Sequence, residues 1–253
     1  MISVSGIRGV FGTDLTPENL ARFTAAYGTW LKGGTVVLGR DSRVTGQICE
    51  DIVASTLASV GCDVIKVGIV PTPTVAMGVL RHNADGGIII SASHNPAQWN
   101  ALKLLNGTSE FMTASEGKEM IAISDSGEFN YKMYDEIGSI SEDNDLLQYH
   151  IEEILKLDYI DPEIIRAAKL SVAVDAVNGA GSVGVPLLLE KLGIETVHTI
   201  HCTPNGLFPH NPEPLPEHLT EICDLVNSSG ADIGVVTDPD ADRLALVDNT
   251  GTL

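Results

Sequence analysis

Short apolar segments alternate with helix-forming segments along most of this 253-residue chain. The clearest apolar segment runs without interruption from Gly87 to Ser91, as is typical of a strand that is buried on both faces of a sheet. Strands that alternate with helices predict an α/β fold with a mainly parallel sheet and helices on both faces. The expected strands are 35–38, 63–67, 87–91, 170–175, 195–200, 233–237 and 244–248, and the expected helices are 17–32, 46–60, 74–81, 114–123, 145–156, 181–192 and 216–228.

The pattern of strands and helices is interrupted once in the middle of the chain. It loosens between residues 106 and 145, where Gly, Ser, Glu and Asp dominate, and a fresh helix begins at Pro162. A second series of strands and helices then follows. We therefore predict two consecutive α/β domains with mainly parallel mixed sheets, covering residues 1–157 and 158–253.

The charge of the chain limits the classes of ligand. The formal net charge is −19, so a nucleic-acid-binding domain, which needs a basic face, is set aside. An acidic surface also repels anionic substrates, so that a phosphate site needs a local concentration of Lys and Arg. No uncharged apolar stretch has the length of a membrane span, and the first residues do not resemble a signal peptide. The four cysteines include no C-x-x-C pair, which leads us to expect buried free thiols and a cytoplasmic protein.

The sharpest local signal is the segment Ser91-Ala92-Ser93-His94-Asn95-Pro96, directly after an apolar strand. Ligands of open parallel sheets bind beyond the carboxyl ends of the strands, which is where Ser93 is expected. A serine hydroxyl needs a base or an electrophile to become a nucleophile. His94 is adjacent, but adjacent side chains of an extended segment point in opposite directions. On these residues alone, a nucleophilic loop and an ordinary turn that closes the strand remain equally open.

A second signal is the segment Asp238-Pro239-Asp240-Ala241-Asp242-Arg243, which follows the strand expected at 233–237. Carboxylates at alternate positions of a tight loop can converge on one hard cation. A calcium EF-hand is excluded, because Arg243 and Asn249 occupy the positions that require Gly and Glu. We therefore predict a Mg²⁺ site rather than a solvated acidic turn.

Basic residues accompany both segments. Arg8 and Arg40 each lie beside glycine, in Gly6-Ile7-Arg8-Gly9 and Gly39-Arg40-Asp41-Ser42-Arg43, where guanidinium groups can grip a phosphate. Lys103 lies in an apolar strand after Ser93. Such a lysine can have a lowered pKa and act as acid or base, or it can be an ordinary strand lysine that extends its ammonium to water.

Taken together and in this order, the segments resemble the α-D-phosphohexomutase family, which includes phosphoglucomutases, phosphomannomutases and phosphoglucosamine mutases. The resemblance covers the whole chain and matches the first two of the four domains of that family. It implies that the third and fourth domains, which bind the sugar and its phosphate, are absent from this chain. It also implies that the 253-residue chain alone has no significant turnover.

The resemblance implies a role for each residue. Ser93 is expected to be phosphorylated and to share Mg²⁺ with Asp238, Asp240 and Asp242. The residues expected to line the site or act in it are Arg8, His94, Lys103 and Arg243, and those expected to support the phosphoserine loop are Arg40, Asp41 and Asn95. The family reaction interconverts hexose 6-phosphate and hexose 1-phosphate through a hexose bisphosphate.

Several alternatives stay open at this stage. The substrate is expected to be glucosamine phosphate, with mannose or glucose phosphate as the alternative. A phosphatase with the same serine, or a non-catalytic anion-binding module, would carry similar segments. The oligomeric state is not predicted.

Overall fold

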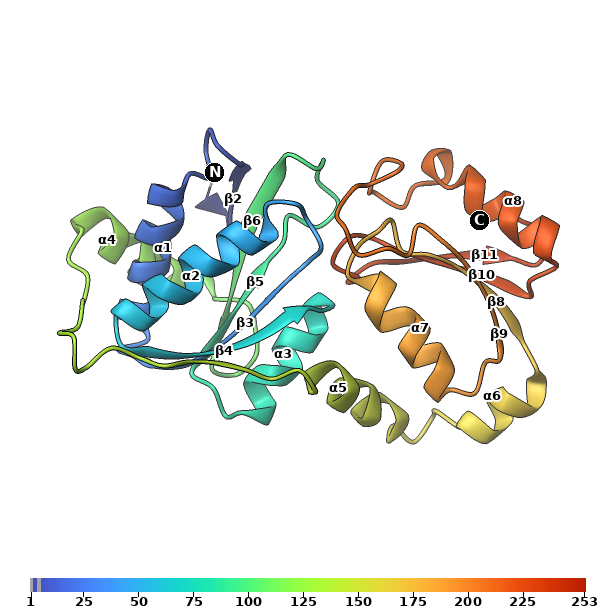
Figure 1. Cartoon of the computed structure of the whole chain (residues 1–253), viewed down its shortest axis with the longest axis horizontal. Coiled ribbons are helices and arrows are strands. Elements are labelled where there is room, and N and C mark those ends of the chain that lie inside the picture. The colour runs from blue at the N-terminus through green and yellow to red at the C-terminus, as the bar shows by residue number, and fades with distance from the viewer. Residues whose placement is uncertain (1, 4–5) are drawn as a thin grey trace.

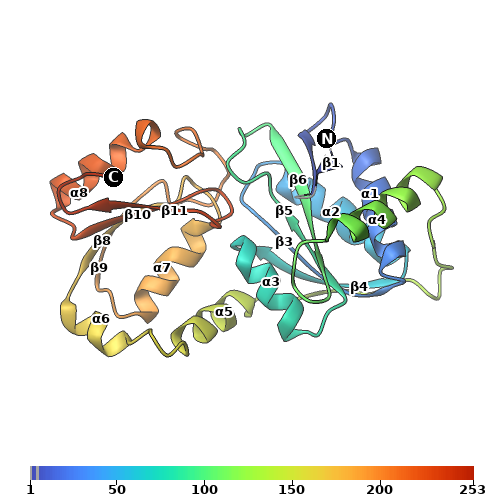
Figure 2. The same ribbon diagram turned by 180° about the vertical axis from the view of Figure 1, so that it is seen from behind.

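The computed structural model describes residues 2–3 and 6–253, which form two α/β units side by side (Figures 1 and 2). The first unit has a seven-stranded sheet in the order β1-β2-β6-β5-β3-β4-β7. Its strands are β1 (Ile2–Ser3), β2 (Gly6–Val10), β3 (Gly34–Arg40), β4 (Cys62–Ile69), β5 (Gly86–Ile90), β6 (Trp99–Asn106) and β7 (Ile140–Glu142). Strands β3, β4, β5 and β7 run parallel, whereas β1, β2 and β6 pair antiparallel.

Helices cover both faces of the first sheet and so bury its apolar strands. The helices are α1 (Pro17–Trp30), α2 (Gly46–Ser59), α3 (Thr72–Arg81), α4 (Ala114–Ser126) and α5 (Leu146–Leu155). Helices α1, α2 and α4 pack on one face, around the core residues Leu20, Leu57 and Met120. Helices α3 and α5 pack on the other, where Val75 and Leu146 meet Ile89 of β5. Every residue of β5 is buried, as its continuous apolar sequence predicts.

The second unit is a smaller sheet of the same kind. Its four strands lie in the order β11-β10-β8-β9, with β11 antiparallel to its neighbour and the others parallel. The strands are β8 (Ser171–Asp175), β9 (Thr196–Ile200), β10 (Ile233–Thr237) and β11 (Leu244–Asp248), and the helices are α6 (Pro162–Ala168), α7 (Gly181–Lys191) and α8 (Thr220–Ser229). Helix α8 packs on one face of this sheet, and α6 and α7 pack on the other. The α/β class with mainly parallel mixed sheets is therefore confirmed.

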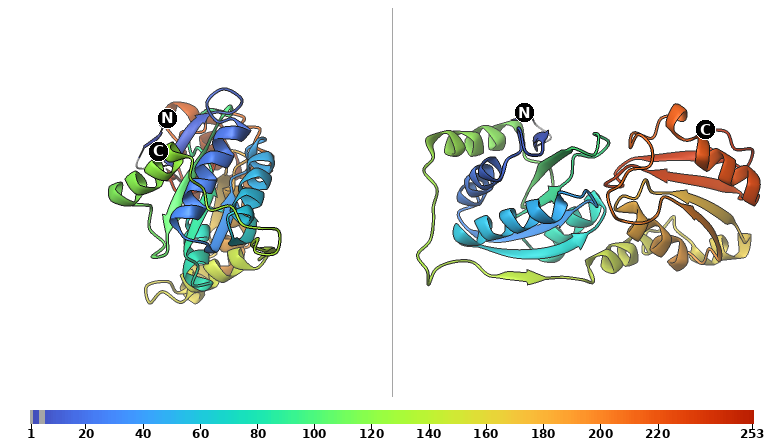
Figure 3. Two further views of the ribbon diagram at one scale, coloured as in Figure 1. Left: turned by 90° about the vertical axis from the view of Figure 1, so that its left-hand side faces the viewer. Right: turned by 45° about the horizontal axis from the view of Figure 1, so that its top comes forward.

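The structure differs from the sequence expectation at several elements. The helix expected over 216–228 is a short 3₁₀ turn, η1 (Pro216–His218), followed by α8. Strands β1, β2 and β7 had not been expected, since β1 and β7 are short and all three lie at or near an edge of the sheet. Figure 3 shows how the segment after α4 runs along the outer edge of the first unit to β7 and α5.

Helix α5 lies where the two units approach each other. It packs against α3 of the first unit and contacts α7 of the second. Among residues 2–3 and 6–253, no helix is long and apolar enough to cross a membrane.

Candidate phosphoryl-transfer site

Ser93 lies just beyond the carboxyl end of β5, as its sequence position predicts. Its backbone adopts a left-handed conformation, with φ at 48°. The Ser93 hydroxyl donates to Oδ2 of Asp238 at 2.6 Å and lies 3.3 Å from Nδ1 of His94. The left-handed turn at Ser93 brings its hydroxyl and the His94 ring together, unlike the extended segment expected from the sequence, in which adjacent side chains point in opposite directions. Burial, followed by the nearby Arg243 and Arg8, lowers the pKa of His94, so the imidazole tends to be neutral.

Arg43 holds the Ser93 loop from beneath. Its guanidinium is fully buried and donates to Oδ2 of Asp41 at 3.0 Å. It also donates to four carbonyl oxygens, those of Ser93 (2.5 Å), Asn95 (2.7 Å), Pro96 (2.8 Å) and Trp99 (3.0 Å). A single planar cation thus fixes the path of this loop, which suits the rigid fork of an arginine.

Asp41 completes this support because β3 and β5 are parallel neighbours and end together. Its Oδ2 accepts a hydrogen bond from the Ser91 hydroxyl at 2.7 Å, and the Ser91 oxygen in turn accepts from the Ser93 amide at 2.9 Å. Asp41 therefore lies under the loop as expected. Arg40, in contrast, turns its guanidinium toward Gln47 at 2.9 Å and Glu50 at 3.6 Å.

Three aspartates follow β10 in the second unit and converge as their spacing predicts. Asp238 and Asp240 are buried and Asp242 is exposed, and their candidate ligand oxygens all lie within 4.8 Å of one another. Oδ2 of Asp240 accepts from Lys103 at 2.5 Å and from the Thr72 hydroxyl at 2.6 Å. Oδ1 of Asp240 is buried and has no hydrogen-bond partner among the described residues.

The electrostatics of the aspartates favour the binding of a cation. Burial and the neighbouring Asp240 raise the pKa of Asp238 to about 7. Burial acts to raise the pKa of Asp240 too, but the Lys103 ammonium outweighs it and holds that pKa below its ordinary value. A buried carboxylate oxygen without a partner is costly. The all-oxygen donor set, the orphan Oδ1 and the raised pKa of Asp238 fit a Mg²⁺ ion.

Lys103 enters the site from β6, whose side chains alternate between the two faces of the sheet. Its ammonium also donates to Oδ2 of Asp242 at 3.0 Å. Burial favours the neutral amine, but the carboxylates of Asp240 and Asp242 outweigh it and raise the pKa of Lys103. Of the two readings that the sequence left open for Lys103, a lowered pKa does not describe this arrangement, in which the residue is an ammonium.

The arginines expected to line the site lie at its margin. Arg8, on β2, donates to Oδ1 of Asn95 at 2.8 Å and so contacts the Ser93 loop. The Arg243 side chain is partly exposed, and its Nη1 lies 3.6 Å from Oε1 of Glu213. The backbone amide of Arg243 donates to Oδ1 of Asp238 at 3.3 Å.

The site is built from both units, which direct contacts join. The Thr72 amide donates to the Asp240 carbonyl at 2.9 Å, and the Ser42 hydroxyl donates to the Asn178 carbonyl at 2.6 Å. Sequence reasoning missed Thr72 and did not assign Arg43 to the site. Arg43 lies in the same segment as Arg40 and Asp41 and could have been found, whereas nothing local marks Thr72.

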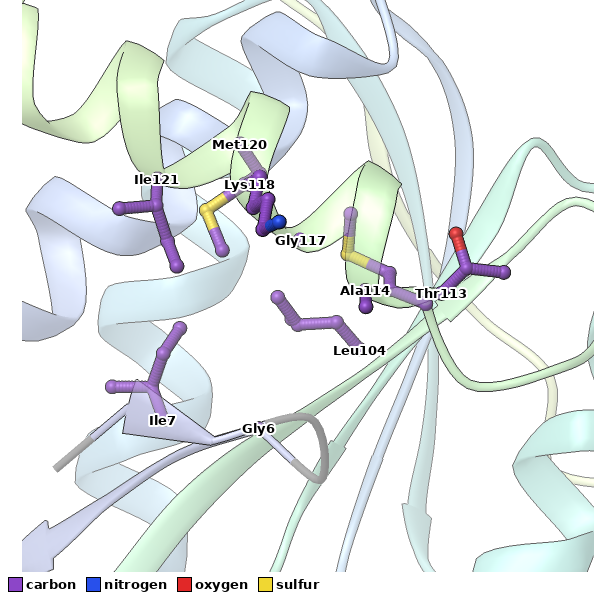
Figure 4. A pocket seen from close by; sticks show the side chains of 10 residues that line it. Gly6, Ile7, Leu104, Thr113, Ala114, Gly117, Lys118, Met120 and Ile121 are labelled. Atoms are coloured by element: carbon purple, nitrogen blue, oxygen red, sulfur yellow. The ribbon is translucent and has the colours of Figure 1, made fainter.

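An apolar pocket lies on the other face of β6 and is separate from this site. It has a volume of about 290 Å³ and lies between β2, β6 and α4. Ile7, Leu104 and Ile121 converge on it in Figure 4. Because Leu104 and Lys103 are consecutive strand residues, they point to opposite faces, and the pocket belongs to the packing of α4.

Comparison with known proteins now defines the class. The description "Phosphoglucomutase/phosphomannomutase, alpha/beta/alpha domain I" matches residues 2–131, and "domain II" of the same family matches residues 148–251. The chain belongs to the phosphoglucomutase/phosphomannomutase family.

Three proteins illustrate how similar this chain is to members of the family and how much of their length it covers. The chain is 39% identical over 252 residues to a phosphoglucomutase/phosphomannomutase of Thermococcus kodakarensis, covering 97% of this chain and 54% of the relative. It is 37% identical over 248 residues to a probable phosphoglucosamine mutase of Methanopyrus kandleri, covering 98% and 53%. A solved phosphoglucomutase/phosphomannomutase family protein from Burkholderia thailandensis superposes with a TM-score of 0.83 at 26% identity, covering 100% of this chain and 56% of that one. The chain thus spans about half the length of the curated relatives it matches.

Proposed function

We propose that this chain provides the phosphoryl-carrying half of a phosphohexomutase, which interconverts hexose 6-phosphate and hexose 1-phosphate. The observation that carries the proposal is the hydrogen bond of 2.6 Å between the Ser93 hydroxyl and Asp238, a member of the buried aspartate cluster. A serine at a strand terminus and a cation site in direct contact are the two parts that phosphoryl transfer requires.

Ser93 would carry the phosphoryl group, and Asp238, Asp240 and Asp242 would hold Mg²⁺ together with an oxygen of that group. Bound Mg²⁺ would neutralise charge that develops on the transferred phosphoryl. The Arg43 cation and the Ser91–Asp41 pair keep the Ser93 loop in place. A rigid nucleophile and a fixed acceptor position account for much of such catalysis.

The remaining residues would bind phosphate and move protons. Lys103 is an ammonium that donates to two aspartates in this arrangement, so it must leave Asp240 and Asp242 and give up a proton to solvent before its neutral Nζ accepts a proton from a sugar hydroxyl. His94 lies 3.3 Å from the Ser93 oxygen and can exchange a proton with it. We propose that Arg8 and Arg243 approach the phosphates from the margin, and that Asn95, which binds Arg8, and Arg40 support the loop.

The proposed substrate is glucosamine phosphate, with a bisphosphorylated sugar as the intermediate. This is supported by the relative from Methanopyrus kandleri, which is named a probable phosphoglucosamine mutase. The relative from Thermococcus kodakarensis is named phosphoglucomutase/phosphomannomutase, which keeps glucose and mannose phosphates as the alternative.

The test is an isomerisation assay on a protein of the relatives' full length that contains this chain. Glucosamine, glucose and mannose phosphates are compared, with Mg²⁺ and a trace of sugar bisphosphate. Isomerisation that exceeds hydrolysis, and its loss in Ser93→Ala, supports the mutase. Hydrolysis without isomerisation would indicate a phosphatase instead of a mutase. Full activity of Ser93→Ala would show that Ser93 does not carry the phosphoryl group.

We also propose that the domain boundary lies between residues 157 and 158, in the link between α5 and α6. Helix α5 packs on α3, and α6 packs with the second sheet, which supports a division between them. Limited proteolysis that cleaves first near this link would agree with the boundary.

We propose a cytoplasmic location as well. The four cysteines are unpaired, which supports this location.

A further inference from the structure

A second cluster of metal-ligating side chains lies in the second unit, apart from the three aspartates. Asp175 ends β8, His201 follows β9, and His210 belongs to the long loop before η1. Both parallel strands end at the same edge of the sheet, and the loop returns to that edge. The candidate ligand atoms of these three residues all lie within 4.8 Å of one another.

Both imidazoles direct one nitrogen at the same carboxylate oxygen. Nδ1 of His201 and Nε2 of His210 each lie 3.1 Å from Oδ2 of Asp175. Three ligands bound tetrahedrally to one zinc ion at about 2.0–2.1 Å lie roughly 3.3 Å from one another. The two measured separations therefore already match those of a coordinated set.

In each ring, the nitrogen that points away from Asp175 faces an oxygen acceptor. Nδ1 of His210 lies 2.8 Å from the carbonyl oxygen of Asn211, which can only accept, so this nitrogen carries the hydrogen. Nε2 of His201 lies 3.4 Å from Oε2 of Glu221. The other two nitrogens, Nδ1 of His201 and Nε2 of His210, point at Oδ2 of Asp175, so that a cation which displaced their hydrogens would meet two nitrogen lone pairs and one carboxylate oxygen. Metal-bound histidines have this arrangement, with the second nitrogen held by a carboxylate or a carbonyl.

A backbone hydrogen bond orients Asp175 as the third ligand. Its Oδ1 accepts from the Val177 amide at 2.9 Å, which leaves Oδ2 to face the rings.

We propose that Asp175, His201 and His210 bind a divalent transition-metal ion of the zinc type, with water in the fourth position. Imidazole nitrogen together with one carboxylate suits Zn²⁺ and its neighbours in the transition series, whereas Mg²⁺ prefers oxygen ligands. This site is independent of the cation at Asp238, Asp240 and Asp242.

The proposed ion would stabilise the long loop between β9 and η1, which packs against Arg43 beneath the Ser93 loop. Phe208, two positions before His210, lies under the Arg43 guanidinium, with 5.0 Å between the Arg43 Cζ and the ring centroid. A Cβ at Gly206 would lie 2.2 Å from the Ser42 carbonyl oxygen, so the loop packs directly on the first unit. Arg43 in turn donates to the carbonyl of Ser93. The role assigned to the ion is therefore structural.

The test is a calorimetric titration of the 253-residue chain with Zn²⁺, in excess Mg²⁺ so that the three aspartates of the first site are occupied. We expect one Zn²⁺ to bind and to raise the midpoint of thermal unfolding. His201→Gln and His210→Gln should each weaken binding by at least about 10–100-fold, the range that the loss of an outer-shell partner alone already costs. His218→Gln is the matched control, because His218 is in η1, which follows the same loop, and lies outside the cluster; this variant should bind Zn²⁺ as the wild type does.

Circular dichroism of the metal-free variants checks that they fold. Equal Zn²⁺ binding in the wild type and in both cluster variants would overturn the proposal, as would no binding in the wild type. If a variant does not fold, anomalous diffraction at the zinc edge from wild-type crystals decides. A peak bound by Asp175, His201 and His210 agrees with the site, and a peak at the three aspartates of the first site alone refutes it.

Discussion

At the scale of single residues, the site depends on a few buried charges that offset one another. Asp240 is the clearest case, because one of its oxygens binds Lys103 and Thr72 while the other has no partner among the described residues. Three carboxylates and one ammonium leave net negative charge in a buried place. Such a site gains most from a divalent cation.

Replacing Asp240 with Asn should weaken Mg²⁺ binding while the fold persists. The amide oxygen can still accept from Lys103 and Thr72, but one charge of the cation site is lost. We expect affinity to fall by at least about tenfold, since even outer-shell partners of metals are worth ~10–100-fold. Calorimetric titration measures it. Asp224→Asn, at an exposed residue of α8, is the control and should bind Mg²⁺ as the wild type does.

Replacing Arg43 with Ala should be strongly destabilising. Asp41 would stay buried without its cation, and four carbonyl oxygens would lose a donor. Breaking a buried pair in this way costs about 3–5 kcal/mol. Urea denaturation measures the free energy of unfolding. The control is Arg166→Ala, which removes an exposed pair with Glu163 and should cost less than about 0.5 kcal/mol. Equal losses in the two variants would contradict this account.

At the scale of elements, the packing of α5 on α3 makes stability depend on pH. Nδ1 of His150 lies 2.9 Å from the Thr74 hydroxyl, and burial lowers the pKa of His150 below its ordinary value of 6.5. The folded state therefore binds the proton less well than the unfolded state. This contribution to stability is present above the unfolded pKa and is lost as the pH falls through the folded pKa.

We expect the free energy of unfolding of the wild type to decrease from about pH 7 to 5.5, with the part due to His150 absent in His150→Gln. Glutamine keeps a hydrogen-bonding group for Thr74 but does not titrate in this range. Urea titrations at several pH values compare the two slopes. The interpretation fails if the variant loses stability as steeply as the wild type.

The elements also define what the sequence alone could predict. The apolar run of β5 and the aspartate spacing after β10 are local patterns, and both predicted their places in the fold correctly. Thr72 could not be found, because it meets Asp240 only after the two units pack together. The same holds for His201 and His210, which meet at Asp175 through a sheet edge and a long loop. The sequence left the pKa of Lys103 open because the carboxylates that bind Lys103 are on the other unit.

At the scale of the whole molecule, the site is shared between the two units. Ser93 is contributed by one unit and the aspartates by the other, and the chain spans about half the length of its curated relatives. Positioning of the substrate is worth up to ~7–11 kcal/mol of the barrier in favourable cases. Segments that hold the sugar and its second phosphate therefore matter greatly for the rate.

We expect the 253-residue chain alone to show no significant mutase turnover. A coupled assay with saturating Mg²⁺ and a trace of sugar bisphosphate measures it, and a protein of the relatives' full length is the positive control. Turnover by the chain alone of roughly 1–10³ per second, the ordinary range of enzymes, would show that nothing further is needed.

The most direct test of the central claim is peptide mapping by mass spectrometry of a protein of the relatives' full length that contains this chain and is purified from cells. The account predicts one phosphoryl group in at least part of the sample, located on Ser93 and absent from Ser93→Ala. The geometry leads to this expectation because the Ser93 hydroxyl already contacts the aspartate cluster at Asp238. A phosphoryl group found on a different residue, with Ser93 unmodified, would contradict the account.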